Sequence, residues 1–173
     1  ISTEPPRRVR GSFHFFADIR DGALKLVEGD LESTTSLHHI ISFYRPDEIY
    51  NLAAQSHVGT SFKQPEYTIN SNFLGVVNLL ETVEMIEDYN PRIYQASTSE
   101  MFGNRNKPES FHENSRFAPE SPYAIAKLAA HNYCRMKREP GMFVSCGILF
   151  NHESEIRGGD FVTQKIARGA VDI

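Results

Sequence analysis

The stretch "RIYQASTSEMFG" (Arg92–Gly103) decides how this chain folds. It is apolar and β-prone as far as Ala96, which predicts a buried strand. A row of polar residues follows directly: Ser97, Thr98, Ser99 and Glu100. Two interpretations compete for this row. It is either an ordinary polar end where a strand meets solvent, or a catalytic row held at the edge of a sheet.

Outward from this strand, the chain alternates strands with helices. Further strands are expected over 23–31, 47–54 and 143–150, and helices over 33–45, 68–87, 121–139 and a short segment at the end. Ser121 before Pro122 is a helix start signal, because a capping hydroxyl precedes a proline at the first helical position. Apolar periodicity predicts one face of the 68–87 helix, made of Ile69, Phe73, Val76, Val77, Leu80 and Val83. The order predicts an α/β fold with a parallel sheet, right-handed crossovers and strands buried on both faces.

Composition narrows the class of protein. The 173 residues are 40% hydrophobic and 23% charged, with a formal net charge of −4, so no basic footprint for nucleic acid or an anionic membrane is present. No apolar run approaches the roughly 20 residues that a membrane span needs. The two cysteines, Cys134 and Cys146, have no CxxC spacing, which predicts a reducing, cytoplasmic compartment and no metal site.

Polar residues follow each expected strand. The segments are Gly29–Asp30, Ala53–His57, Ser97–Glu100 and Asn151–Glu153. Ligands of parallel sheets bind beyond the carboxyl ends of the strands, so these segments are expected to converge on one binding edge. A single polar strand end is routine, but this convergence favours the catalytic interpretation of the row after Ala96.

Tyr123 and Lys127 form a Tyr-x-x-x-Lys pair in the helix expected after Ser121. The i,i+4 spacing places both side chains on one helix face. An ammonium beside a phenol favours the phenolate, so such a tyrosine can act as a base toward a substrate hydroxyl. The spacing also arises by chance, and its place one turn into a capped helix makes it informative.

The blocks "STSEMFG", "SPYAIAK" and "GILFNHES" resemble extended short-chain dehydrogenases/reductases that act on nucleotide sugars. With "PDEIYNLAAQSHV", "QPEYT" and "RIYQASTSE", the sequence is similar to the GDP-mannose 4,6-dehydratase family from about Leu24 onward. This resemblance implies a Rossmann-like, doubly wound sheet, with 1–150 as a partial NADP-binding domain and 151–173 as the beginning of a substrate-binding portion. It also implies that the first strands and their Gly-rich turn are missing, and that the chain corresponds to roughly half of a family member.

The resemblance implies a lyase that converts GDP-mannose to GDP-4-keto-6-deoxymannose. Thr98 would hydrogen-bond the sugar 4-hydroxyl, and Tyr123 would remove its proton as hydride passes from C4 to NADP. Lys127 would hold the nicotinamide ribose and tune Tyr123. Glu100 would then take the C5 proton and assist the loss of water from C6, before the hydride returns to C6.

The resemblance also implies binding residues. The cofactor contacts would be Asp30, Leu31, Leu52, Ala53, Ala54, Gln55, Ser56, Tyr67, Lys127, His152 and Arg157. The substrate contacts would be Ser99, Asn151 and Lys165. A homodimer or homotetramer would form through the helices 68–87 and 121–138, with Leu79, Leu128 and Tyr133 facing outward.

Two alternatives stay open. An epimerase or reductase of the same fold needs only the Tyr/Lys and hydroxyl groups, whereas Glu100 supplies the second base of an elimination. The absent Gly-rich turn favours a non-catalytic binding or scaffold module. The sequence also departs from the family at Glu155-Ile156, where Pro-Arg is usual, and at Gln164, where arginine is usual.

Overall fold

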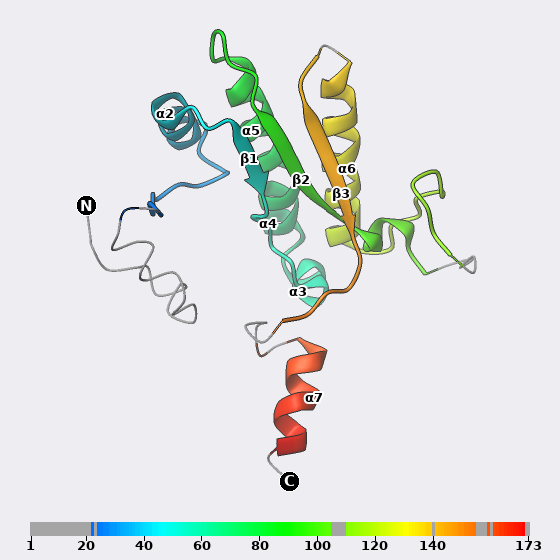
Figure 1. Ribbon diagram of the computed structural model, residues 1–173. Coiled ribbons are helices and arrows are strands. Elements are labelled where there is room, and N and C mark those ends of the chain that lie inside the picture. The colour runs from blue at the N-terminus through cyan, green and yellow to red at the C-terminus, as the bar shows by residue number, and fades with distance from the viewer. Residues whose placement is uncertain are drawn as a thin grey trace. The chain divides into compact units, whose positions relative to one another are not determined.

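The computed structural model of the chain describes residues 22, 24–104, 110–139, 141–154, 159 and 161–171. Gly29–Phe150 forms one compact unit. The described residues outside it belong to a second unit, which contains helix α7 (Val162–Val171). Figure 1 shows the elements of both. The division into cofactor-binding residues 1–150 and substrate-binding residues 151–173 stays a prediction.

The larger unit is built on a parallel sheet (Figure 1). Its strands are β1 (Glu48–Asn51), β2 (Arg92–Thr98) and β3 (Val144–Leu149), in the spatial order β1-β2-β3. Both pairings are parallel. The α/β class with a parallel sheet is therefore confirmed, and the strand ends lie within two to three residues of those predicted.

The strand expected over 23–31 is wrong for the described residues of that segment, which carry no strand. Leu26 and Val27 are 44% and 47% exposed. An extended segment becomes a strand only when a neighbour pairs its backbone N–H and C=O groups. Among the described residues, the sheet has no strand beyond β1 that could do so.

Local signals position the helices as expected. Ser33 caps α2 (Thr34–Tyr44) by accepting a hydrogen bond from the Ser36 N–H, and Arg45 ends it with a φ of 39°. The Ser121 hydroxyl accepts from the Ala124 N–H at 3.0 Å and caps α6 (Pro122–Arg138). These caps satisfy backbone donors that the first helical turn leaves unpaired. A short helix, α3 (Val58–Lys63), lies after the loop that follows β1.

The helix expected over 68–87 begins earlier and contains a wider turn. It consists of α4 (Pro65–Ile69), the π-helical turn η3 (Asn70–Leu74) and α5 (Gly75–Glu84). The π turn rotates the upstream part relative to α5, because its bonds span five residues instead of four. Thr68 and Asn72 are therefore buried where periodicity predicted Ile69, which is 39% exposed.

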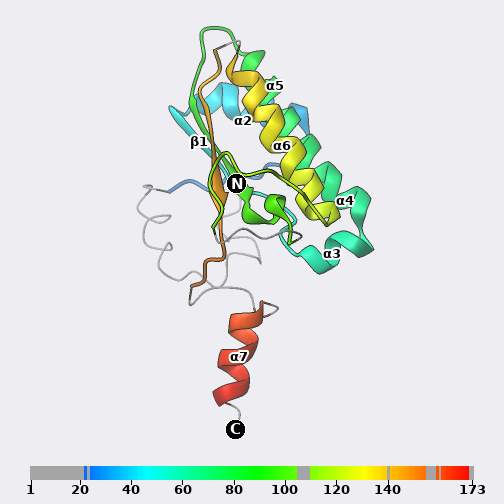
Figure 2. The ribbon, with the colours of Figure 1, turned by 90° about the vertical axis from the view of Figure 1, so that its right-hand side faces the viewer.

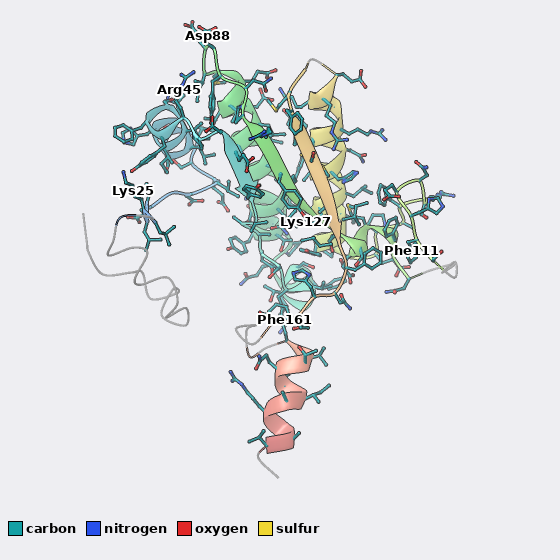
Figure 3. All side chains as sticks on the ribbon, viewed as in Figure 1. Lys25, Arg45, Asp88, Phe111, Lys127 and Phe161 are labelled. Atoms are coloured by element: carbon teal, nitrogen blue, oxygen red, sulfur yellow. The ribbon has the colours of Figure 1, made fainter. Side chains whose placement is uncertain are left out.

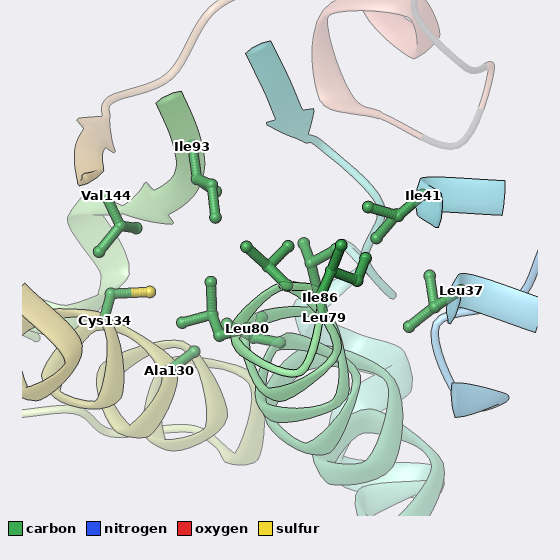
Figure 4. Close-up of a cluster of buried hydrophobic side chains, with 11 residues drawn as sticks. Leu37, Ile41, Leu79, Leu80, Ile86, Ile93, Ala130, Cys134 and Val144 are labelled. Atoms are coloured by element: carbon green, nitrogen blue, oxygen red, sulfur yellow. The ribbon is translucent and has the colours of Figure 1, made fainter. Parts of the chain in front are cut away.

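A core of apolar side chains joins the sheet to α2, α5 and α6 (Figure 4). Leu80, Val83 and Ile93 are 2% exposed or less. Leu79 is also buried, at 4% exposure. Its expected outward orientation is therefore wrong, because α5 faces α2 as well as the sheet and so buries a wider stripe than one sheet contact requires.

Helices α5 and α6 lie on the same side of the sheet (Figure 2). On the other face, the ring centroids of Tyr50 and Tyr94 are 6.0 Å apart, and Tyr50 is 63% exposed. Burial on both faces is therefore not seen at β1 in the described part of this unit. The covered face is the one that carries the α6 residues of the candidate site.

Candidate active site at the carboxyl end of the central strand

The polar row after Ala96 divides into buried and exposed members. Ser97 and Thr98 are 3% and 7% exposed and end β2. The chain then turns into the short 3₁₀ helix η4 (Ser99–Phe102), and the Thr98 hydroxyl accepts the Glu100 N–H at 3.2 Å. Glu100 itself is exposed. The turn thus places a hydroxyl at the strand end and a carboxylate one step farther out.

Tyr123 and Lys127 lie in the first two turns of α6, where Ser121 and Pro122 fix the helix start. Tyr123 is 8% exposed and Lys127 is 4% exposed. Figure 3 labels Lys127. The Lys127 ammonium donates to the carbonyl of Ala96, directly before the polar row, at 2.9 Å. This bond connects the start of α6 to the end of β2. Thr98 and the Tyr-x-x-x-Lys pair are therefore brought to the same edge of the sheet.

Burial lowers the pKa of Lys127 from its ordinary value of 10.5 to about 8. Desolvation is the cause, since no carboxylate of the described residues contributes to the shift. With this pKa, the ammonium keeps most of its proton at pH 7. A buried cation of this kind is suited to hold hydroxyl groups or an anion brought in by a ligand.

One further residue supports this edge. The His131 ring bonds the Ser97 hydroxyl through Nδ1 at 3.0 Å, one turn of α6 after Lys127. It also meets the Phe117 ring edge-on at 5.4 Å between centroids. Sequence reasoning assigned no role to His131. The i,i+4 spacing from Lys127 was the available signal, because it puts both residues on the helix face that packs on β2.

The loop after β1 presents the residues expected to contact a cofactor. Leu52 is 65% exposed, Ala53 and Ser56 are exposed, and Ala54 is partly buried. Gln55 differs, because its side chain is buried and donates to the Thr68 hydroxyl at 3.0 Å. Gln55 therefore fixes the loop, while its neighbours face solvent.

Asn72 holds the same loop from η3. Its side-chain oxygen accepts the Gln55 N–H at 2.8 Å, and its side-chain nitrogen donates to the Gln55 carbonyl at 2.9 Å. Asn72 is 1% exposed. Both hydrogen-bonding groups of the Gln55 backbone are thus satisfied inside the protein, which gives the exposed residues beside it a defined position.

The other predicted contacts are more scattered. Asp30 is exposed and accepts the Glu32 N–H at 2.9 Å, while the Leu31 carbonyl accepts from Asn78 at 2.9 Å. Tyr67 is half-exposed on α4. The remaining predicted contacts belong to the second unit: exposed Asn151 and His152, and Lys165 on α7. Arg157 and Glu155-Ile156 lie outside the described residues.

Two negative findings concern the described part of the chain. It holds no group of three His, Cys, Asp or Glu side chains placed to bind a metal ion. Its helices are also too short or too polar to cross a membrane.

Comparison with known proteins gives the family. The protein-family model described as GDP-mannose 4,6 dehydratase matches residues 11–173 of the sequence. The chain is 46% identical over 162 residues to GDP-mannose 4,6 dehydratase 1 of Arabidopsis thaliana, covering 90% of this chain and 44% of that protein. It is 45% identical over 156 residues to the Homo sapiens GDP-mannose 4,6 dehydratase, covering 88% and 41%. The chain thus spans less than half the length of these relatives.

Solved structures share the fold. RMD from Pseudomonas aeruginosa, complexed with NADPH, gives a TM-score of 0.76 at 25% identity, covering 92% of this chain and 58% of that one. DesIV, a dTDP-glucose 4,6-dehydratase from Streptomyces venezuelae with NAD bound, gives 0.80 at 24% identity, covering 91% and 48%. The second likeness concerns the fold alone. Because the family match spans nearly the whole sequence and the relatives agree with it, the chain belongs to the GDP-mannose 4,6-dehydratase family.

Proposed function

We propose that this chain carries the catalytic edge of a GDP-mannose 4,6-dehydratase, a hydro-lyase acting on a nucleotide sugar. The observation that carries the proposal is the Lys127 bond to the Ala96 carbonyl. It joins a buried Tyr-x-x-x-Lys pair to a strand end that continues into Thr98 and an exposed carboxylate. Family membership supports the sugar nucleotide as GDP-mannose.

In this proposal, Tyr123 takes the proton of the sugar 4-hydroxyl. The positive charge of Lys127 favours the phenolate that performs this step, because an opposite charge stabilises the ionised form of a neighbour. Thr98 orients the same hydroxyl through a hydrogen bond. Ser99 is assigned to the substrate side, and so are Asn151 and Lys165 of the second unit.

Glu100 provides the second base. Oxidation at C4 makes the C5 proton acidic, and a carboxylate beside it can accept that proton while water leaves from C6. Glu100 suits this role because it is exposed just beyond Thr98 at the strand end, where it can meet the sugar that Thr98 orients. An epimerase would not use this group, so the position of Glu100 favours elimination.

The cofactor is proposed to be NADP, which would accept a hydride from C4 of the sugar and return it at C6. RMD, complexed with NADPH, supports a nicotinamide cofactor with the 2′-phosphate. The exposed loop after β1 and the buried Lys127 would hold the nicotinamide side. The proposed contacts are Asp30, Leu31, Leu52, Ala53, Ala54, Gln55, Ser56, Tyr67, Lys127, His152 and Arg157.

Product analysis tests the proposal. The full-length protein is incubated with GDP-mannose and NADP⁺ in D₂O, and the 4-keto-6-deoxy product and deuterium at C5 are measured by NMR. The Glu100→Gln variant should bind the cofactor and lose product formation. Glu87→Gln, an exposed carboxylate in the turn before β2, is the matched control and should keep the activity.

Each failure has a distinct meaning. Dehydratase activity retained by Glu100→Gln would refute the role of that carboxylate. Turnover of another sugar nucleotide without loss of water would favour an epimerase or reductase. Full-length protein that binds NADPH in a fluorescence titration and turns over no sugar nucleotide would favour a binding module.

Self-association is also proposed, as a homodimer or homotetramer in which α5 and α6 pair with those of a second copy. Leu128 and Tyr133 of α6 are partly buried and leave some apolar surface for this contact, whereas Leu79 does not. Light scattering of the full-length protein at micromolar concentration checks the assembly, and a monomer would contradict it. A cytoplasmic location stays a prediction.

A further inference from the structure

The face of α6 that carries Tyr123 and Lys127 continues into sulfur and nitrogen side chains that the proposed reaction does not use. His131 and Cys134 follow on this face, and Cys146 lies on β3, which α6 covers. Cys134 belongs to the buried core, and Cys146 packs against it. Figure 4 shows Cys134 on α6 facing Val144 of β3. Both cysteines are free thiols, and the chain contains only these two.

Cys146 packs against the apolar core and also has polar and charged groups near its sulfur. The Cys134 thiol and the His131 ring lie close enough to its sulfur to lower its pKa, and the Ser97 hydroxyl bonds the His131 ring at 3.0 Å. Arg138 donates from Nε to the Val144 carbonyl at 2.6 Å, so its guanidinium lies close to the same strand. These groups favour the Cys146 thiolate, whereas the partial burial of the sulfur opposes it. A buried cysteine with a packing role alone does not need polar or charged neighbours such as His131 and Arg138.

The two thiols influence each other in opposite directions. The pKa of Cys146 lies well below its ordinary value, first because the Cys134 thiol donates to it and then because of His131 and Arg138. The pKa of Cys134 is raised, since its proton is held by the Cys146 sulfur and since it is buried. Exposure follows the same order: Cys134 is 0% exposed and Cys146 is partly exposed.

We propose that Cys146 and Cys134 form a modification site for hydroperoxides, in which Cys146 is oxidised first and Cys134 then closes a disulfide between α6 and β3. This site does not depend on the proposed dehydratase activity. The oxidant is expected to be a small molecule, because only a small molecule reaches the partly buried Cys146 sulfur. Thiolate character together with access is what makes a cysteine reactive toward peroxide.

The chemistry balances in two steps. The Cys146 thiolate attacks the terminal oxygen of the hydroperoxide, so an S–O bond forms and the O–O bond breaks. Cys146 is oxidised to the sulfenic acid, and the peroxide is reduced to an alcohol, or to water from hydrogen peroxide, after taking up protons. The Cys134 sulfur then attacks the Cys146 sulfur and displaces hydroxide. The Cys134 thiol proton converts that hydroxide to water.

Loss of the negative charge on Cys146 makes the second step possible. While Cys146 is a thiolate, it raises the pKa of Cys134 and keeps that thiol protonated. Sulfenic acid formation removes this charge. The buried thiol next to it then becomes the nearest nucleophile, so the disulfide is expected to form within one chain.

Peptide mapping of the full chain tests the site. The protein is treated with a small molar excess of hydrogen peroxide, with glutathione as a reference in a parallel tube, and remaining thiols are blocked with N-ethylmaleimide. The expected result is a peptide joining Cys134 to Cys146, with both thiols lost together. Between pH 7 and pH 6, glutathione oxidation should slow about tenfold with its thiolate fraction, whereas Cys146 oxidation should slow much less.

A matched pair of variants assigns the roles. In Cys134→Ser, the Cys146 sulfenic acid should persist and react with dimedone. In Cys146→Ser, Cys134 should remain unmodified because it is buried. The proposal is overturned if both thiols survive peroxide that oxidises the reference, if Cys134 is oxidised while Cys146 stays intact, or if the disulfide joins two chains. Mapping of the unsubstituted protein distinguishes these outcomes even where a variant does not fold.

Discussion

Replacing Lys127 by Met should make the stability of the protein depend differently on pH. The pKa of Lys127 falls from 10.5 to about 8 through burial, which corresponds to about 3 kcal/mol of desolvation at about 1.4 kcal/mol per tenfold change. Between about pH 8 and 10.5, the unfolded chain binds this proton more tightly than the folded chain. The free energy of unfolding contributed by Lys127 therefore rises with pH across that window. From pH 7 to pH 9.5, the rise amounts to about 2 kcal/mol.

Lys127→Met removes this dependence. At pH 7 the variant is relieved of a buried charge but leaves the Ala96 carbonyl without its donor, a loss of about 1–3 kcal/mol. The two effects nearly cancel, so the variant should unfold at pH 7 with a free energy close to that of the wild type. The carbonyl effect is the same at every pH. Wild type should therefore gain about 2 kcal/mol over the variant by pH 9.5.

Urea unfolding of both proteins at several pH values measures this difference directly. Lys63→Met, at an exposed position on α3, is the matched control for the loss of a lysine. Groups that titrate identically in wild type and variant cancel in the comparison. A difference between wild type and Lys127→Met that stays constant from pH 7 to pH 9.5 would refute the argument that burial suppresses this ammonium.

Three further outcomes are expected. Gly103→Ala should destabilise the protein by more than about 1 kcal/mol in urea unfolding, because Gly103 has a φ of 69° and an added Cβ would lie 2.1 Å from the Ala118 carbonyl oxygen; an unchanged midpoint would contradict this. Ser121→Ala should cost about 1 kcal/mol through the lost cap, measured in the same way and restored by Ser121→Asp. Lys137→Gln should weaken the acid sensitivity of stability. The pKa of Glu81 is held below 4.5 chiefly by its hydrogen bond from Lys137, so that contribution is present above pH 4.5 and lost as pH falls through the lower folded value. An acid-unfolding profile that Lys137→Gln leaves unaltered would contradict this prediction.

Elements with local signals could be predicted from the sequence. The cap residues Ser33 and Ser121 each lie directly before their helix, and hydroxyl caps act within three residues. The strand at 92–98 was recognisable because its apolar run ends sharply in hydroxyls. The Tyr-x-x-x-Lys pair followed from helical spacing together with its place one turn into a capped helix, and the structure adds the Ala96 carbonyl that Lys127 binds.

Features that depend on distant partners could not be read in this way. Asn72 is buried because it binds the Gln55 backbone, 17 residues earlier, and no periodicity encodes that pairing. Leu79 is buried because α2 packs against α5, a contact between segments far apart in the chain. His131 acquires a partner only when α6 lies on β2. In each case, tertiary packing decides the environment of a residue whose local sequence has an ordinary pattern.

The π turn Asn70–Leu74 has a consequence for how the chain tolerates insertions and deletions. Positions four apart drift around a regular α-helix, and one wider turn reverses part of that drift. Thr68, Asn72, Val76 and Leu80 are each 1% exposed or less, so one continuous stripe serves the loop at its start and the core at its end. Deleting a single residue from this turn would restore a regular α-helix and leave the two halves of the stripe within about 20° of each other, because seven residues make almost two full turns. The same deletion within α5 would instead turn the core half by about 100° away from the loop half, although every side chain of the stripe was still present.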